Sequence, residues 1–490
     1  MLRIVLGDQL FPAKYFDKKQ KIFMAETWDL CTRYDYHKQK IYHTLASMRH
    51  FAELMEKKNF QVHYSKLDPN KKPTFLTLLS AYIKKHKVDK LVIVEPADQF
   101  MRSDLIDFAK KHHLNIELEP NPSFMIDVNW FASYMEGRKR PFMKTFYEKI
   151  RRETGILMTG NKPLGGKFSF DSDNRKKLPK DFEPAPIKTM IPGAIEKQVI
   201  KLVNRYFHNH PGTLEQIWLP VTRAQALKQW RGFLNHRMEK FGDFQDALHP
   251  KNPFLYHSLI SASMNIGHLL PEEIIEDACA VHEDGQIPLN STEGFVRQIL
   301  GWREFIRLIY ESYSSRLYET NHFNHQRQLT PSWYHGTTGL PPMDDAIHHA
   351  QAYGYCHHIQ RLMVAANLMN LCEIEPTQAY RWFMEMFVDV GDWVMAANVF
   401  GMGLMSDGGI FATKPYIAGS NYIRKMSHYS KGPWCDIWDG LYWRFVHNKR
   451  DVLTGNPRLS LMVKSFDKMD TVRRKKILRD ADHFLSEHTF

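Results

Sequence analysis

Two adjacent histidines are the residues of this chain best suited to move a proton. His357 and His358 stand in the stretch Tyr-Cys-His-His-Ile-Gln-Arg at positions 355–361. Imidazole titrates near neutral pH, so it can act as a general acid or base. Neighbouring positions on a helix are about 100° apart. We therefore predict an amphipathic helix in which one histidine points into a pocket and the other supports it. A surface histidine beside a buried one would give the same pattern.

Charged and aromatic residues near the histidines could hold a large planar cofactor. Arg361 ends the same stretch, Trp382 follows, and Asp389 begins the run Asp-Val-Gly-Asp-Trp-Val-Met-Ala-Ala-Asn at 389–398. An arginine and a carboxylate can form a buried, hydrogen-bonded ion pair, and tryptophans provide flat apolar surfaces. A purely structural salt bridge remains the alternative.

Composition narrows the class of protein. With 490 residues, the chain is expected to form two or three domains. Its 66 basic and 54 acidic residues give a net charge of +12, which somewhat favours a polyanionic partner such as DNA. Its apolar runs are too short for a membrane span, and the first residues resemble a strand, not a signal peptide. A cytoplasmic protein is therefore expected. The five cysteines are scattered without a C-x-x-C pair, which excludes a disulfide framework: Cys31, Cys279, Cys356, Cys372 and Cys435.

The first 130 residues alternate between strand-like and helix-like segments, which predicts a parallel sheet with right-handed crossovers. Ligands on such sheets bind outside the carboxyl ends of the strands, where Asp8, Gln9 and Glu26 stand. Asp8 and Glu26 could equally cap helices or turns, and no glycine-rich dinucleotide motif is present. The predicted strands are 2–6, 21–25, 61–65, 90–95 and 115–118, and the predicted helices are 38–57, 73–86 and 103–112.

The remaining chain is predicted to be helical after a connector. Basic residues, glycines and prolines concentrate between 135 and 195, with one helix predicted at 142–154. The predicted fold class is α/β plus all-α, with an α/β domain at 1–134, a connector at 135–195 and a helical domain at 196–490. Helices are predicted at 223–241, 271–282, 292–314, 343–370 and 376–387.

Several motifs in this order resemble the bacterial (6-4) photolyase and cryptochrome branch of the photolyase family. Besides the histidine block, they are Gly-Asp-Gln-Leu at 7–10, Gly-Gly-Lys-Phe-Ser-Phe-Asp at 165–171, Phe-Leu-Tyr-His-Ser-Leu-Ile-Ser at 254–261 and Trp-Arg-Glu-Phe at 302–305. The resemblance implies a light-driven DNA repair flavoprotein, with an antenna domain followed by a helical FAD domain. UV-damaged DNA is the implied partner, and a monomer without membrane contact is expected.

The resemblance also implies which residues bind FAD. Small hydroxyls at a helix start suit the diphosphate, although a plain N-cap serine would look the same. Met395 stands where relatives place a hydrogen-bonding side chain facing flavin N5, which changes the flavin redox state that is favoured. The implied cofactor-binding residues are His257, Ser258, Ile260, Ser261, Trp302, Arg361, Asp389, Met395 and Asn398.

Catalytic and electron-transfer residues follow by the same resemblance. His358 is the expected proton donor and His357 its neighbour, while Gln298 and Tyr416 would orient a flipped lesion. Trp382 would lie next to the flavin in a photoreduction chain. More distal positions match Trp333 and Tyr334, and Trp393 is a further candidate, although it could be plain core.

The chain departs from this branch at its iron–sulfur site. Three of the four cysteine positions match Pro342, Ser430 and Pro433, and only Cys435 is retained. Proline and serine cannot replace thiolates, so no iron–sulfur cluster and no other metal is expected. The relatives' antenna chromophore, 6,7-dimethyl-8-ribityllumazine, would lie at Asp8, Gln9 and Glu26.

Two other functions are compatible with these residues. A blue-light photoreceptor of the same fold would not repair DNA, and Met395 and the missing cluster favour such divergence. A basic DNA-binding protein could have kept the scaffold and lost FAD.

Overall fold

The computed structural model describes residues 1–455 and 459–490, and the chain begins with a five-stranded parallel sheet. The strand order is β3-β2-β1-β4-β5, so the order reverses direction between β1 and β4. In sheets of this kind, ligands bind at the carboxyl ends beside such a reversal. All five predicted strands are confirmed. They are β1 (Leu2–Ile4), β2 (Lys21–Ala25), β3 (Val62–Ser65), β4 (Lys90–Val94) and β5 (Asn115–Glu119).

Helices cover both faces of the sheet because its central strands are apolar on both sides. α2 (Lys38–Lys57) packs Met48 and Phe51 against one face. α3 (Phe75–His86) and α4 (Gln99–Lys111) pack against the other. The predicted helices in this region are thus confirmed, with small shifts at their ends. A short turn, η1 (Ala13–Tyr15), follows β1, and α1 (Trp28–Thr32) follows β2.

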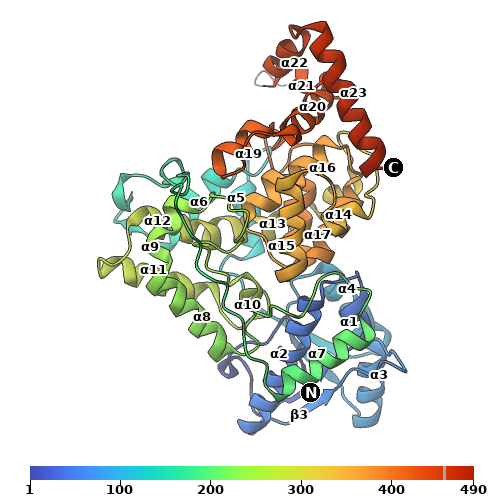
Figure 1. Cartoon of the computed structure of the whole chain (residues 1–490). Coiled ribbons are helices and arrows are strands. Elements are labelled where there is room, and N and C mark those ends of the chain that lie inside the picture. The colour runs from blue at the N-terminus through green and yellow to red at the C-terminus, as the bar shows by residue number, and fades with distance from the viewer. Residues whose placement is uncertain (456–458) are drawn as a thin grey trace.

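The segment from 128 to 206, which includes the predicted connector, packs on both parts of the molecule. α5 (Val128–Met135) and α6 (Met143–Thr154) contribute Phe131 and Phe146 to the core of the helical part. The chain then forms a small hairpin, descends past the helices and reaches α7 (Ala194–Tyr206), which lies against α2 (Figure 1). The predicted domain limits remain a prediction. The hairpin strands are β6 (Met158–Thr159) and β7 (Lys162–Pro163), and the turns are η2 (Leu164–Gly166) and η3 (Asp171–Asp173).

From residue 223 onward, the described residues form helices and loops, which confirms the predicted helical half. α20 and α23 pack side by side at the end of the molecule farthest from the sheet (Figure 1). The elements are α8 (Arg223–His236), α9 (Met238–Phe244), α10 (Ser261–Asn265), α11 (Pro271–Glu283), α12 (Leu289–Val296), η4 (Arg297–Arg303), α13 (Glu304–Glu319), α14 (Ser332–His335), α15 (Pro341–Tyr353), η5 (Gln360–Ala366), α16 (Asn367–Leu371), α17 (Pro376–Met386), α18 (Asp392–Ala396), η6 (Ala397–Gly403), α19 (Ser420–Met426), α20 (Pro433–Asn448), α21 (Arg450–Thr454), α22 (Ser460–Asp467) and α23 (Thr471–His488).

The predicted continuous helix at 343–370 is wrong. α15 ends at Tyr353 because Gly354 adopts a left-handed conformation (φ 60°) and closes the last turn. A Cβ atom at Gly354 would lie 2.3 Å from Val388 Cγ1, so the site also requires glycine for close packing. His357 therefore lies in the segment between two helices, and His358 is at the start of the next helical turn.

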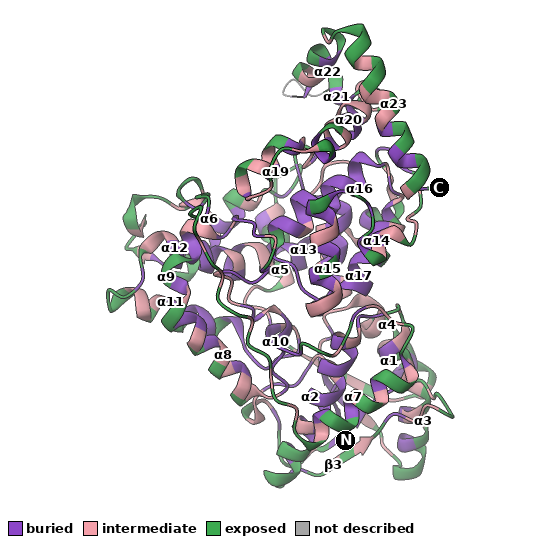
Figure 2. Ribbon diagram, in the orientation of Figure 1, coloured by how far each residue is buried: buried purple, intermediate pink, exposed green. Residues whose placement is uncertain are grey.

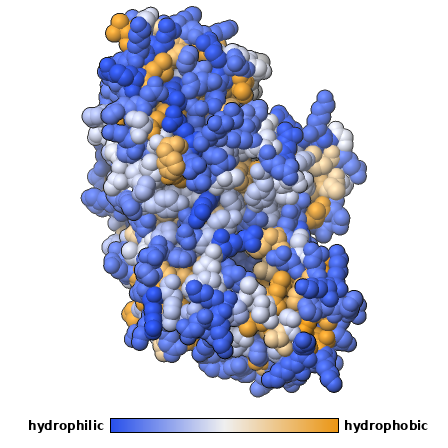
Figure 3. Space-filling view, turned by 90° about the vertical axis from the view of Figure 1, so that its right-hand side faces the viewer, coloured by the Kyte–Doolittle hydropathy of each residue, from blue (hydrophilic) through white to orange (hydrophobic). Residues whose placement is uncertain are grey.

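Burial is concentrated where the central helices of the second half meet. Figure 2 colours α13, α15 and α17 largely as buried, with exposed residues on the outer helices. Four of the largest fully buried side chains are Trp230, Trp333, Trp382 and Trp438. The face in Figure 3 is mostly hydrophilic, with hydrophobic residues in small groups. Among the described residues, no helix is both long and apolar enough to cross a membrane.

Candidate active site

Three π-helical segments carry residues that were expected to bind a cofactor or the lesion. Gln298 and Trp302 lie in η4, Arg361 in η5 and Asn398 in η6. η5 packs on η6, and α13, which continues η4, packs on η6 as well. π-Helical turns are rare and occur frequently at functional sites. Their convergence therefore marks this part of the helical core as the candidate site.

Arg361 and Asp389 form a buried, two-pronged ion pair. The Arg361 guanidinium donates from Nη1 to Asp389 Oδ1 (2.8 Å) and from Nη2 to Oδ2 (3.2 Å). Ser261 Oγ also donates to Asp389 Oδ2, at 2.7 Å. Burial alone would raise the pKa of Asp389, but the Arg361 charge and the hydrogen bonds from Arg361 and Ser261 together outweigh burial and hold that pKa below its usual value. The pair therefore stays ionised and joins three segments that were expected to contact one cofactor.

The predicted phosphate-binding turn is a strained loop before α10. Leu255 and Leu259 both have positive φ angles, 40° and 64°, and such backbone strain in non-glycine residues clusters at functional sites. Ser258 is partly buried in this loop, and Ile260 is the N-cap of α10. Asn265, at the other end of α10, donates to the backbone carbonyl of Asp389 at 2.7 Å. The loop is thus attached to the ion pair at both ends of a single helical turn.

The side chains expected beside a flavin ring lie in the same region. Met395 is buried in α18, and Asn398 donates to the backbone carbonyl of Val394 at 2.7 Å. Trp302 stacks on Phe411, with ring centroids 6.0 Å apart. These residues offer apolar and amide surface, and Met395 provides no strong hydrogen-bonding group.

The two adjacent histidines have different surroundings. His357 is buried, and its Nδ1 accepts a hydrogen bond from the backbone N–H of Ile359 at 3.3 Å. His358 is exposed, yet surrounding protein and the Arg361 charge lower the pKa of its imidazole to about 4. His358 is thus the imidazole that a substrate can reach, and His357 lies behind it.

Residues of the connector interact with the neighbours of both Gln298 and Tyr416. Both side chains are partly buried. Arg297, next to Gln298, donates to Asp171 at 3.1 Å. Burial, followed by the Asp171 charge, raises the pKa of the Tyr416 phenol, while Arg175 lowers it. Asp171 and Arg175 were not expected to belong to the site. The available signal was the connector motif at 165–171, which ends at Asp171 and precedes Arg175 by four residues.

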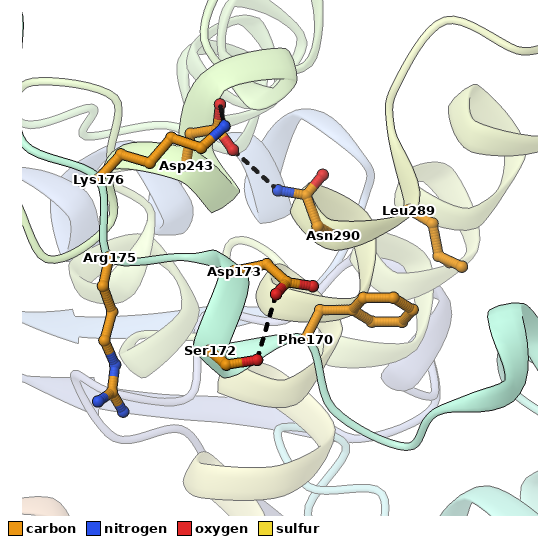
Figure 4. A pocket seen from close by; sticks show the side chains of 8 residues that line it. All are labelled: Phe170, Ser172, Asp173, Arg175, Lys176, Asp243, Leu289 and Asn290. Carbon is orange, nitrogen blue, oxygen red and sulfur yellow. Dashed lines mark hydrogen bonds and ion pairs between the residues drawn. The ribbon is translucent and has the colours of Figure 1, made fainter.

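A surface cavity of about 670 Å³ is partly lined by this connector segment. Figure 4 shows Lys176, Asp243 and Asn290 grouped on one side and Phe170 and Leu289 on the other. Lys176 pairs with Asp243 at 2.8 Å, and Asn290 donates to Asp243 at 3.1 Å. The lining residues are Phe170, Ser172, Asp173, Arg175, Lys176, Asp243, Leu289 and Asn290. None of them is among the expected site residues.

Aromatic residues lead away from the Arg361–Asp389 pair. The Arg361 guanidinium lies 4.1 Å from the ring centroid of Phe387, which lies 5.7 Å from Trp382. The Trp382 indole donates to the backbone carbonyl of Trp333 at 2.8 Å. Tyr334 follows in sequence and donates to Glu385 at 2.6 Å. Trp382, Trp333 and Tyr334 therefore lie on one side of the ion pair.

Trp393 has different neighbours from the other three aromatic residues. Its ring makes an edge contact with Phe124 at 5.0 Å and lies 4.7 Å from the Arg303 guanidinium. Its backbone N–H donates to Asp98 at 2.9 Å. These contacts place Trp393 where the helical part meets the α/β part.

The residues expected to bind an antenna are divided between two environments. Asp8 follows β1 and is partly buried, and burial raises its pKa to about 6. Gln9 donates to the backbone carbonyl of Val94 at 2.8 Å. Glu26 is fully buried and bonded to the Arg49 guanidinium at 2.6 and 2.8 Å, as well as to Tyr64 and the backbone of Leu67. Its oxygens are thus engaged within the fold.

Two charged residues at the strand-order reversal were not anticipated. Asp98 lies in the loop after β4, and burial followed by the Asp392 charge raises its pKa to about 7. Lys40 donates to the backbone carbonyl of Val390 at 2.5 Å, and its charge lowers the pKa of Asp8. The rule that pointed to Asp8 also applies to Asp98, since both follow neighbouring strands of the sheet.

The positions expected to have lost cluster ligands lie around buried tryptophans. Pro342 is buried in α15, Ser430 and Pro433 are exposed, and Cys435 is buried in α20. Trp434 and Trp438 make an edge contact at 6.1 Å. Within residues 1–455 and 459–490, no three His, Cys, Asp or Glu side chains are arranged to hold a metal ion.

Comparisons with known proteins agree with this arrangement of a sheet domain and a helical site. A family model described as deoxyribodipyrimidine photo-lyase-related protein matches residues 3–219, and one described as the FAD binding domain of DNA photolyase matches residues 295–433. The (6-4) photolyase of Agrobacterium fabrum is 33% identical over 505 residues, covering 99% of both chains. The deoxyribodipyrimidine photo-lyase of Salmonella typhimurium is 25% identical over 272 residues, or 52% of this chain and 53% of that protein.

Solved structures share the fold. A bacterial class III photolyase from Agrobacterium tumefaciens superimposes with a TM-score of 0.57 and 15% identity, covering 99% of this chain and 98% of the other. A Synechocystis cryptochrome gives a TM-score of 0.57 and 12% identity, covering 97% and 93%. The predicted α/β plus all-α fold is thereby confirmed.

Proposed function

Because the chain belongs to the photolyase family, as its full-length relative shows, we propose that it is a (6-4) photolyase that repairs UV-damaged DNA with light absorbed by FAD. The observation that carries the proposal is the position of His358. This exposed imidazole stands three residues before Arg361, whose ion pair with Asp389 suits a flavin. A proton donor beside a flavin is what (6-4) repair requires, whereas cyclobutane dimer repair needs no such acid.

The residues present fit FAD, and the chain contains the matching FAD-binding domain. His257, Ser258, Ile260 and Ser261 would border the diphosphate, and Trp302, Met395 and Asn398 would border the rings. When bound, FAD supplies the light absorption and the transferred electron. Arg361 would hold positive charge beside the ring and so favour its anionic reduced form. Asp389 would keep Arg361 in place, since their bond is two-pronged.

His358 would give a proton to the lesion, and His357 would orient it from behind. Gln298 and Tyr416 would hold the flipped bases. The shared contacts of Asp171 with Arg297 and with the surroundings of Tyr416 support a common site for these two residues.

Trp333 and Tyr334, the distal members, would pass an electron to Trp382, which would pass it to the oxidised flavin. The contact series from Arg361 through Phe387 to Trp382, and the hydrogen bond from Trp382 to Trp333, support this order. The separate surroundings of Trp393 support a role for it outside this path.

An antenna chromophore, 6,7-dimethyl-8-ribityllumazine, would lie at the strand-order reversal. This position is supported by the charged and polar side chains grouped there, which are Asp8, Gln9, Lys40 and Asp98. Glu26 would act indirectly by fixing Arg49 and the loop at Leu67. No iron–sulfur cluster would be bound, because Pro342, Ser430 and Pro433 offer no thiolates. The five unpaired cysteines support a cytoplasmic location.

A blue-light photoreceptor is the second candidate, and Met395 favours it. Illumination of the reduced protein with DNA carrying either a (6-4) photoproduct or a cyclobutane dimer separates the candidates. We expect the original bases to be restored only in the DNA that carries the (6-4) photoproduct. Repair of cyclobutane dimers alone would contradict the lesion assignment, and flavin photochemistry without repair would favour the photoreceptor.

A further inference from the structure

The histidine of the phosphate-binding loop lies against one of the two expected catalytic histidines. The His257 and His357 rings are stacked, with centroids 4.7 Å apart and planes inclined by 19°. The Phe241 ring contacts His257 by its edge, at 5.9 Å and 88°. His257 therefore faces the proton-transfer site, in addition to the place in the loop that suggested a phosphate contact.

Hydrogen bonds indicate which tautomer His357 adopts. Its Nδ1 accepts from the N–H of Ile359, so a neutral His357 must carry its proton on Nε2. That Nε2 is buried and has no partner within the described chain. The backbone of Gln245 raises the pKa of His257 by accepting a hydrogen bond. Since Nε2 of His257 also lacks a partner, this bond must use Nδ1–H.

Arginine and histidine side chains surround the stacked pair. After burial, the groups that act on His257 are Arg237, His358 and Arg361, and those that act on His357 are His257, His358, His349 and Arg361. Each of these groups lowers the pKa of the imidazole on which it acts. A second positive charge at this pair is therefore unfavourable, because each of these neighbouring groups opposes it.

Resting on the photolyase function proposed above, we infer that His257 is a positioning residue that keeps His357 neutral, with its proton on Nε2. His358 is then the only imidazole of the three able to hold the transferable proton at the substrate. Two stacked bases titrate as a coupled pair, and one charge excludes the other. His257 would thus decide which histidine becomes charged.

Replacement of the stacking base tests the inference. In His257→Phe, the new ring stacks but cannot compete for a proton, and its π face stabilises an imidazolium. The pKa of His357 is expected to rise by about one unit or more. The measurement is ¹⁵N NMR of the FAD-containing protein with labelled histidines, from pH 8 to 5, with His357→Gln used to assign the signal. Wild-type His357 should remain neutral and protonated on Nε2 throughout.

His325→Phe is the control, because His325 likewise stacks on an aromatic ring, Phe323 at 5.6 Å, and has an unpartnered buried Nε2. It should leave the His357 signal unchanged. If the phenylalanine variant does not fold, His257→Tyr repeats the test. Its hydroxyl can replace a polar atom of the imidazole. In both variants, the repair rate should peak at a different pH from wild type.

An unshifted His357 signal in the folded variants would overturn the inference. Loss of FAD with an unshifted signal would do so as well and would assign His257 to the phosphate site. Because the NMR signal needs no substrate, a wild type without repair would remove the proposed function and still leave the effect of His257 on His357 measurable.

Discussion

Arg361 and Asp389 are 28 positions apart, yet their side chains form two hydrogen bonds of 2.8 and 3.2 Å inside the helical core. The bond attaches the segment after the two histidines to the loop before α18. Asp389 also accepts from Ser261, so three parts of the chain converge on one carboxylate.

Asp389→Asn should weaken both the fold and FAD retention. Removing one partner of a buried ion pair leaves an uncompensated charge and typically costs about 3–5 kcal/mol. The measurements are urea unfolding and the flavin-to-protein absorbance ratio. Asp436→Asn, at an exposed position of α20, is the control. An unchanged midpoint and full flavin content would contradict a shared role of the pair.

Trp382→Phe should slow light-driven reduction of oxidised flavin while FAD remains bound. A phenyl ring preserves much of the packing of this fully buried side chain, but it is harder to oxidise than indole. The readout is the flavin absorbance during blue illumination with an external reductant. Trp393→Phe is the matched control and should photoreduce normally. Normal photoreduction in Trp382→Phe would remove Trp382 from the path.

His358→Ala should abolish (6-4) repair while FAD and damaged-DNA binding survive. Loss of a positioned general acid typically costs about 10²–10⁴ in rate. His357→Ala should cost less, because it would act by misplacing its neighbour. Product analysis after illumination checks both. Near-normal repair by well-folded His358→Ala would exclude His358 as the donor.

Repair should become faster as the pH falls from 8 toward 6. The pKa of His358 is lowered to about 4, so its protonated fraction increases as the pH falls through this range. Bound phosphates and a reduced flavin would raise this pKa and move the rise toward neutrality. Repair yield per absorbed photon, measured at each pH with saturating DNA, tests the direction. A rate that increases with pH would exclude protonated His358 as the reactant.

The folded protein should lose stability steeply between about pH 6.5 and 4. Burial lowers the pKa of His37, His43, His257, His349 and His358 to about 4. Below about pH 6.5, the unfolded chain therefore binds protons that the folded chain does not. The contribution of these histidines to the free energy of unfolding is complete above that pH and is lost as the pH falls. Asp8, Asp98, Asp246 and Glu304, whose pKa values burial raises to about 6 or 7, act in the opposite direction. They are fewer than the histidines with lowered pKa values, which also include His268, His325 and His357. Urea midpoints across this range should fall toward acid.

Sequence patterns alone identified the chemistry and most local structure of this protein. All five strands and the helical second half were predicted, because alternation of apolar residues is a local property. The pairing of Arg361 with Asp389 was also anticipated from residue types within the resembling motifs. The identity of the family followed from motifs in order along the chain.

The tertiary structure decided which of those residues lie in contact. It ended α15 at Gly354, since packing against Val388 leaves no room for a Cβ atom, and so placed His357 outside a helix. In the folded chain, Arg49 donates a hydrogen bond to Glu26, and the His257 ring stacks on the His357 ring. These outcomes depend on contacts between segments remote in sequence, whose register is set by the packing of whole helices and strands. A local pattern specifies a residue's chemistry and helical or extended state, whereas its partner is decided only when the core closes around both.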